Sequence, residues 1–247
     1  MRTLPFTLSL LLIASAASGQ PARPMVDYTV KVADIDGQLF HVITDIRQIN
    51  QPTLNLSLPT WTPGWYTIEN YAKNILRFHV ADRTGQRLQP QMVHKQTWRI
   101  DTTGISELKV EFDYQAMLLA LNQATINPEF AFFTGTQLFL QAGGYRDIPS
   151  TVRFELPAGW RVATALQDTS DPMVFTAPDY DTLVDQPSVM GRFDVTRFMV
   201  DGKPHYLVAN PAGVFSKEKT EKLTEYLTKV ATVEREIFSG LPYDKYW

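Results

Sequence analysis

The chain has 247 residues, of which 44% are hydrophobic and 12% aromatic, so it is long enough to bury a large core. It contains no cysteine, which excludes disulfides, cysteine nucleophiles, thiolate zinc sites and iron–sulfur clusters. The formal net charge is −3, and the one local basic cluster, Lys217 to Lys222, is interleaved with glutamates, so we expect no nucleic-acid partner.

The first 19 residues have the pattern of a secretory signal peptide. Arg2 precedes an apolar stretch from Leu4 to Ala14, and the small residues of Ser15 to Gly19 follow. The apolar stretch is shorter than the roughly 20 residues that span a bilayer. We therefore expect residues 1–19 to be a signal peptide, the protein to be periplasmic or secreted, and no membrane anchor to remain after cleavage.

Residues 25–212 read as a β domain. Val26 to Val32 and Phe40 to Ile46 alternate around Asp36-Gly37, which is typical of a hairpin. Short alternating runs separated by glycine and proline then recur along the chain. They lie at residues 54–58, 76–80, 98–100, 108–114, 152–156 and 206–208. This spacing predicts a mainly β fold, an antiparallel β-sandwich-like domain.

Two stretches depart from the alternating pattern. Residues 115–127 are rich in helix formers, yet their place between strands is equally compatible with a loop or a strand extension. Residues 216–238 show apolar side chains at three- and four-residue steps, with Ser216 as N-cap and Gly240 as the stop. This segment predicts an amphipathic helix that opens a second unit, residues 213–247.

Three motifs point to a family. The first contains Trp61, Pro63, Gly64 and Tyr66, and the last is the run from Gly240 to Tyr246. The middle motif is made of Tyr180, Asp181, Asp185, Pro187 and Gly191. Together with the run from Tyr71 to Ile75, they resemble the N-terminal region of the glycyl aminopeptidase family of HExxH zinc metallopeptidases. Trp65 stands where that family usually has serine.

The resemblance implies an N-terminal β domain followed by a thermolysin-like α+β catalytic domain that binds zinc and cleaves peptides. On this basis, residues 213–247 are the start of a truncated catalytic domain. A zinc site of that kind needs two histidines at i and i+4 with a glutamate between them. The four histidines, His41, His79, His94 and His205, contain no such pair. We therefore expect no catalytic residue and no metal ligand in this chain, and zinc in the missing domain.

Other candidate sites are less specific. By analogy with related zinc aminopeptidases, Gly135 and Gln137 are candidates for one wall of the substrate cleft. The aromatic run from Trp61 to Tyr71 is either a stacking platform for peptide or sugar or part of the core, and we favour the core. The carboxylate pairs Asp181/Asp185 and Asp168/Asp171 lie in turn-rich contexts, which favours turn formation over glycoside hydrolysis.

The expected function is that of a non-catalytic, cleft-shaping domain of an exported zinc aminopeptidase that prefers N-terminal glycine or small residues. The alternative is a stand-alone exported β-sandwich module that binds peptide or carbohydrate. An exposed apolar face on the helix of residues 216–238 would favour the first interpretation.

Overall fold

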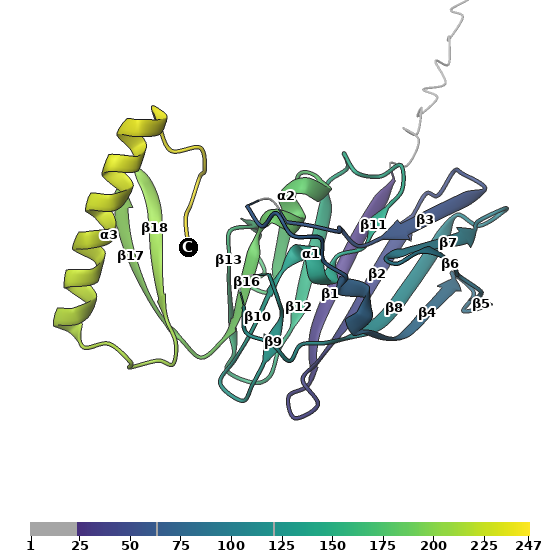
Figure 1. Ribbon diagram of the computed structural model, residues 1–247, viewed down its shortest axis with the longest axis horizontal. Helices are drawn as coiled ribbons and strands as arrows, with labels where there is room; N and C mark the ends of the chain where they lie inside the picture. The colour runs from purple at the N-terminus through teal and green to yellow at the C-terminus, as the bar shows by residue number, and fades with distance from the viewer. Residues whose placement is uncertain (1–23, 63, 121) are drawn as a thin grey trace, which may run out of the picture.

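The computed structural model describes residues 24–62, 64–120 and 122–247 (Figure 1). The expected signal peptide and the motif residue Pro63 lie outside these ranges. No helix in the described residues is long and apolar enough to cross a bilayer.

The largest element is an eight-stranded sheet built around the expected hairpin. Strand β1 (Met25–Asp34) pairs antiparallel with β2 (Leu39–Arg47), and their alternate side chains are buried. The sheet order is β14-β15-β12-β1-β2-β8-β4-β5. Its other strands are β4 (Ile75–Asp82), β5 (Arg87–Leu88), β8 (Glu107–Gln115), β12 (Ser150–Glu155), β14 (Gln167–Asp168) and β15 (Val174–Ala177).

Two four-stranded sheets cover the buried side of the large sheet, with orders β11-β3-β7-β6 and β13-β16-β10-β9. Phe78 of β4 stacks on Trp98 of β7 at 4.5 Å, and Phe40 of β2 meets Phe133 of β10 edge-on at 5.5 Å. The strands are β3 (Thr53–Ser57), β6 (Gln91–His94), β7 (Thr97–Asp101), β9 (Thr125–Ile126), β10 (Phe130–Thr134), β11 (Gln141–Ala142), β13 (Arg161–Thr164) and β16 (Pro187–Gly191). The expected mainly β fold with antiparallel sheets is confirmed.

One strand pair departs from the mainly antiparallel pattern. Strand β1 pairs with β12 in parallel, from Val26 opposite Ser150 to Lys31 opposite Glu155. More than 100 residues separate the two strands, so the chain can cross over between them, which a parallel pair requires. The open stretch 115–127 holds the end of β8, a loop and β9, and its described residues form no helix.

Short helices join the sheets at one end of the sandwich. They are the 3₁₀ turn η1 (Tyr71–Asn74), α1 (Gly135–Leu138) and α2 (Tyr180–Asp185). Figure 1 shows α1 and α2 near one another, and each directly precedes or follows a strand of the small sheets. This end of the sandwich therefore collects residues from three distant parts of the sequence.

A second body follows the sandwich. Strands β17 (Asp194–Val200) and β18 (Lys203–Ala209) form a separate two-stranded sheet against α3 (Lys217–Phe238). Figure 1 places this body beside the sandwich. The boundary expected at residue 212 stays a prediction, although β17 contacts both β18 and α3.

Helix α3 has the expected caps. The Ser216 hydroxyl accepts from the amide of Lys219 at 3.3 Å, and Ser239 ends the helix in the left-handed region, with the Gly240 amide donating to the Arg235 carbonyl. After the helix, Tyr246 forms a parallel bridge with His205 of β18. Two backbone hydrogen bonds, from Tyr206 to the Tyr246 carbonyl and from Tyr246 to the Pro204 carbonyl, hold the end of the chain against β18.

The apolar stripe of α3 faces outward. Leu227, Val230, Val233 and Ile237 are exposed, whereas Ala231 is the buried residue of the helix. Four threonines, half-buried, lie on the same side as Ala231, and each hydroxyl donates to the carbonyl four residues earlier. These are Thr220, Thr224, Thr228 and Thr232. Because their hydroxyls are satisfied within the helix, their methyl groups are free to pack on the sheet.

Candidate functional site

The motif residues meet at a groove at the α2 end of the sandwich. This groove, called the α2 groove below, has a volume of about 830 Å³. Residues 57–61 form one side, α2 forms another, and Thr136 of α1 and Arg146 complete the lining. Trp61 of the first motif and Tyr180, Asp181 and Asp185 of the second are all among the lining residues. Segments more than 100 residues apart therefore build one concave surface.

Helix α2 is positioned by its own cap and by one buried tyrosine. The Asp179 carboxylate accepts from the Thr182 amide at 2.7 Å, which satisfies the start of the helix. The Tyr180 ring is buried, and its hydroxyl donates to the Phe139 carbonyl at 2.8 Å. Burial raises the pKa of Tyr180 well above its ordinary value, so this hydroxyl stays protonated and acts as a structural donor.

The two aspartates of α2 differ in their partners. Arg146 holds Asp181 through two contacts, Nη2 to Oδ1 at 2.6 Å and Nε to Oδ2 at 3.0 Å, and this pairing raises the pKa of Arg146. Asp185 is exposed and makes no ion pair or side-chain hydrogen bond with the described residues. The α2 groove therefore carries one uncompensated carboxylate.

Both cleft candidates, Gly135 and Gln137, have structural roles in and around α1. Gln137 is fully buried, and its amide is used within the helix cap: Oε1 accepts from the Thr134 amide at 3.0 Å, and Nε2 donates to Thr134 Oγ1 at 2.6 Å. A Cβ on Gly135 would lie 2.6 Å from Val184 Cα, so the backbone that approaches this glycine belongs to α2. Contact of either residue with a substrate stays a prediction.

The remaining motif residues support the strand that leaves α2. Pro187 starts β16 opposite Thr134 of β10. Gly191 ends β16, where an added Cβ would lie 2.8 Å from the Glu129 carbonyl oxygen. Both residues therefore keep β16, and with it α2, close to the α1 end of β10.

The aromatic run contradicts the favoured core assignment. Trp61 is 48% exposed, Trp65 37% and Tyr66 89%, whereas Tyr71 enters the core at 1%. The physical reason is that residues 59–70 close on themselves as a loop outside the sheets, called the aromatic loop below. Gly64, with φ of +81°, turns the backbone at its tip, between Thr62 and Trp65.

A buried glutamine holds the ends of the aromatic loop together. Gln96 is 3% exposed, and its Nε2 donates to the carbonyls of Pro59 at 3.0 Å and Glu69 at 3.1 Å. Its Oε1 accepts from the Ala72 amide at 3.1 Å. The side of the loop is fixed as well, because Thr62 Oγ1 lies 3.1 Å from Thr136 Oγ1. The exposed rings thus stand on an ordered support.

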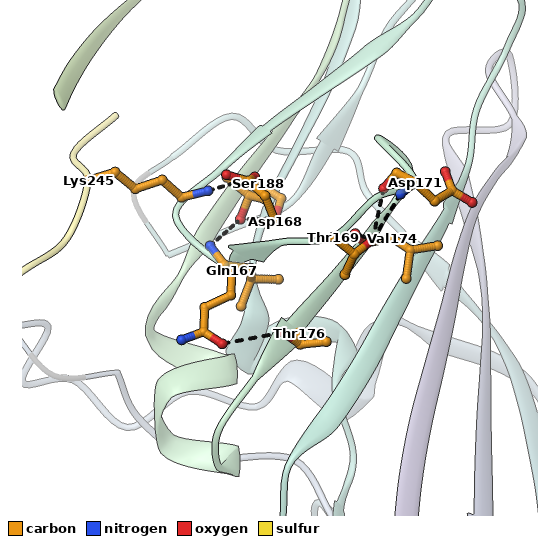
Figure 2. A network of polar contacts seen from close by, with 10 residues as sticks. Gln167, Asp168, Thr169, Asp171, Val174, Thr176, Ser188 and Lys245 are labelled. Atoms are coloured by element: carbon orange, nitrogen blue, oxygen red, sulfur yellow. Dashed lines mark hydrogen bonds and ion pairs between the residues drawn. The ribbon is translucent and has the colours of Figure 1, made fainter.

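A second groove adjoins the first. It has a volume of about 850 Å³, lies between the sandwich and the C-terminal residues 242–247, and shares Thr182, Asp185 and Gln186 with the α2 groove. Figure 2 shows Lys245 reaching Asp168 of β14 at 2.8 Å, beside the contact between Gln167 and Thr176. This ion pair joins the C-terminal segment to the sandwich.

Residues 27–192, more than half of the chain, match the family model of the peptidase M61 N-terminal domain. The chain belongs to the peptidase M61 N-terminal domain family. The match includes the aromatic loop, α1 and α2, so the α2 groove lies within the M61 N-terminal domain.

Solved structures give a similar fold. The chain is similar to an aminopeptidase N family protein from Idiomarina loihiensis, with a TM-score of 0.81, 27% identity and 90% of this chain covered. It spans 38% of the length of that chain. An M1 zinc metallopeptidase from Deinococcus radiodurans is more distant, at a TM-score of 0.49 and 13% identity over 90% of this chain and 54% of that one. No curated protein sequence matches the chain.

The described residues of this M61 N-terminal domain lack the side-chain ligands that a catalytic metal needs. No group of three or more His, Cys, Asp or Glu side chains in residues 24–62, 64–120 and 122–247 could hold a metal ion. His41 bonds to Asp113 at 2.8 Å, and His205 is buried against Tyr243 at 2.9 Å. Both histidines are thereby committed to contacts within the chain.

Sequence reasoning missed Thr136 and Arg146, which line the α2 groove, and Gln96, which holds the aromatic loop. Gln96 and Arg146 lie outside the motifs, and their roles depend on partners 27 to 37 residues away along the chain. Thr136 stands between the two cleft candidates, Gly135 and Gln137, and is the residue of α1 that lines the α2 groove.

Proposed function

We propose that the chain is the cleft-shaping N-terminal part of an exported zinc aminopeptidase that prefers an N-terminal glycine or another small residue. The observation that carries this proposal is the meeting of two motifs, around Trp61 and around Asp185, on one groove. Membership of a peptidase-associated family supports the reaction class. The glycine preference rests on the resemblance to glycyl aminopeptidases, and export rests on the pattern of residues 1–19.

The charge of the α2 groove suits a peptide with a free amino terminus. Arg146 and Asp181 neutralise one another, so the carboxylate of Asp185 remains to attract an α-ammonium group. The lining side chains that remain accessible, such as the Gln141 amide, supply partners for a peptide main chain. This part of the protein would bind and orient a peptide, and the zinc-dependent chemistry would belong to polypeptide outside the described residues.

We also propose that β17, β18, α3 and the C-terminal segment open a thermolysin-like catalytic domain. They form their own sheet and helix next to the sandwich. The outward apolar stripe of α3 supports further polypeptide at this point, because soluble proteins rarely leave such a stripe uncovered.

The test is peptide binding by the full chain. Titration calorimetry compares Gly-Ala-Ala with its N-acetylated form, and NMR follows signals from groove residues. The free amine should bind about two- to five-fold tighter, the range of an exposed ion pair. Asp185→Asn should abolish the difference, whereas Glu225→Gln on α3 should not. If neither peptide perturbs the groove signals, the proposal is wrong.

The alternative, a stand-alone module that binds peptide or carbohydrate, is favoured by one observation. Trp61 and Tyr66 present exposed rings, which suit stacking on a sugar. A neutral oligosaccharide that changed tryptophan fluorescence at lower concentration than any peptide would favour this alternative. A chain that remained monomeric and bound no hydrophobic dye would favour it as well.

A further inference from the structure

The aromatic loop exposes several large apolar side chains. Trp61, Trp65, Tyr66 and Ile68 are all exposed in one segment of eight residues. A second loop, of which residues 117–120 and Asn122 are described, meets it at one contact: the Asn122 side chain donates to Glu69 Oε1, the same oxygen that accepts from Trp65 Nε1. That second loop adds Met117, Leu118 and Leu119, each more than half exposed. Several large exposed apolar side chains in neighbouring segments are typical of a binding site.

Hydrogen bonds hold the aromatic loop at its ends, at its side and at the Trp65 ring. Gln96 ties both ends of the loop, Thr62 ties its side to α1, and Glu69 orients the Trp65 indole at 3.0 Å. Rings held in place before binding lose little conformational entropy when a ligand arrives. An ordered aromatic surface is therefore suited to recognise a side chain, and its order does not come from burial in the core.

The aromatic surface is continuous with the α2 groove. Trp61 belongs to both, since it is an exposed member of the loop and a lining residue of the groove. Asp185 lines the same groove, and an extended peptide advances about 3.3 to 3.6 Å per residue. A peptide whose amino end lies at Asp185 and whose chain leaves the groove past Trp61 brings a following side chain to the aromatic loop.

We propose that the aromatic loop is a specificity element that binds an apolar or aromatic side chain following the amino-terminal residue of a peptide. This inference rests on the proposed function of the α2 groove. It adds a preference for the second side chain of the peptide, which the groove itself does not supply. Charge complementarity at Asp185 places the peptide's amino end, and the rings around Trp61 and Tyr66 select the side chain that follows. A peptide fits better here than a second copy of the chain, because the polar groove that continues the surface matches main-chain groups.

The test uses two probes, Gly-Phe-Ala and Gly-Ser-Ala, titrated into the full chain and followed by tryptophan fluorescence and by the indole N–H signals in NMR. Gly-Phe-Ala should bind about ten-fold tighter, the scale of one buried aromatic group. Trp61→Ala and Tyr66→Ala should reduce that ratio to about three-fold or less. Tyr226→Ala, which removes an exposed ring from α3, is the matched control and should leave the ratio unchanged.

The outcomes separate the two proposals. Asp185→Asn should weaken both peptides equally and leave their ratio intact. Equal affinity of both probes for the wild-type chain overturns the role of the loop and leaves the proposed function standing. Absence of binding by both probes overturns the two together. A change in sedimentation on replacing Tyr66, with no change in peptide preference, assigns the surface to a second copy of the chain and also overturns the inference.

Discussion

Thr62 and Thr136 are 74 residues apart in the sequence, and their hydroxyl oxygens are 3.1 Å apart in the structure. Thr62 also lies 3.2 Å from the Tyr71 hydroxyl, so a chain of three hydroxyl groups runs from the core into the aromatic loop and on to α1. Thr136 is itself a lining residue of the α2 groove. The position of the loop is thus coupled directly to the groove.

This contact should be measurable as a coupling energy. Thr62→Val and Thr136→Val should each lower the free energy of unfolding, and the double variant should lose less than their sum by about 0.5–1.5 kcal/mol, the net value of a hydrogen bond. Chemical denaturation of the wild type, the two single variants and the double variant measures this coupling energy. As a control, Thr169→Val, in another part of the sandwich, should add to Thr136→Val without coupling. Strict additivity of the first pair would show that the hydroxyls do not interact.

Gly135 should resist substitution because of the α2 backbone. In Gly135→Ala, the new Cβ would lie 2.6 Å from Val184 Cα and 2.7 Å from the Leu183 carbonyl oxygen, so the two helices must separate. We expect a loss of about 1–3 kcal/mol in the free energy of unfolding. Gly104→Ala is the comparison, since that site has open space and only the cost of its positive φ, about 1 kcal/mol. A smaller loss at Gly135 than at Gly104 would contradict the close approach.

The stability of the chain should fall at alkaline pH because of buried tyrosines. Burial raises the pKa of Tyr28 and Tyr180 well above the ordinary value of 10. The unfolded chain releases these protons near pH 10, whereas the folded chain retains them. The contribution of the two tyrosines to the free energy of unfolding is therefore fully present below pH 10 and decreases as the pH rises above it.

Denaturation at increasing pH, read together with tyrosinate absorbance, checks this expectation. Tyr180→Phe should cost about 1 kcal/mol at neutral pH, from the lost bond to the Phe139 carbonyl, and should make the alkaline decline shallower. Tyr66→Phe is the control, because that hydroxyl is on an exposed ring. An unchanged alkaline slope in Tyr180→Phe would refute the assignment.

The outward stripe of α3 should govern hydrophobic dye binding without contributing to stability. Val230→Gln and Ile237→Gln should reduce dye fluorescence and leave the free energy of unfolding within about 0.5 kcal/mol of the wild type. Ala231→Gln, on the buried side, should cost about 1–3 kcal/mol. Should the two stripe variants destabilise the chain as strongly as Ala231→Gln, the stripe is part of the folded core.

The strands were predictable because one face of each is buried and alternation records this directly, as in the hairpin β1–β2. The parallel pairing of β1 with β12 was not, because alternation says nothing about partner or direction. The exposure of Trp61 and Tyr66 was also missed. Ring size predicts burial, but the outcome depended on Gln96, a residue distant in sequence that closes the loop outside the sheets.

For the candidate site, the motifs indicated which segments matter but not which atoms are available. Gln137 is a cleft candidate by analogy, yet both atoms of its amide are bonded to Thr134 in the cap of α1. Asp181 and Asp185 look equivalent in the sequence, and only the position of Arg146 makes one of them neutralised and the other free to attract a ligand. Such distinctions arise from tertiary neighbours, which spacing along the chain does not encode.

The row of threonines along α3 makes a second side of this helix apolar. Because each hydroxyl is bonded to the helix's own backbone, the side toward β17 offers methyl groups, while leucine, valine and isoleucine line another side. The lysines and glutamates between these two sides are the charged residues of the helix. A helix that is apolar on two sides is suited to the middle of a three-layer arrangement, in which the hairpin forms one outer layer.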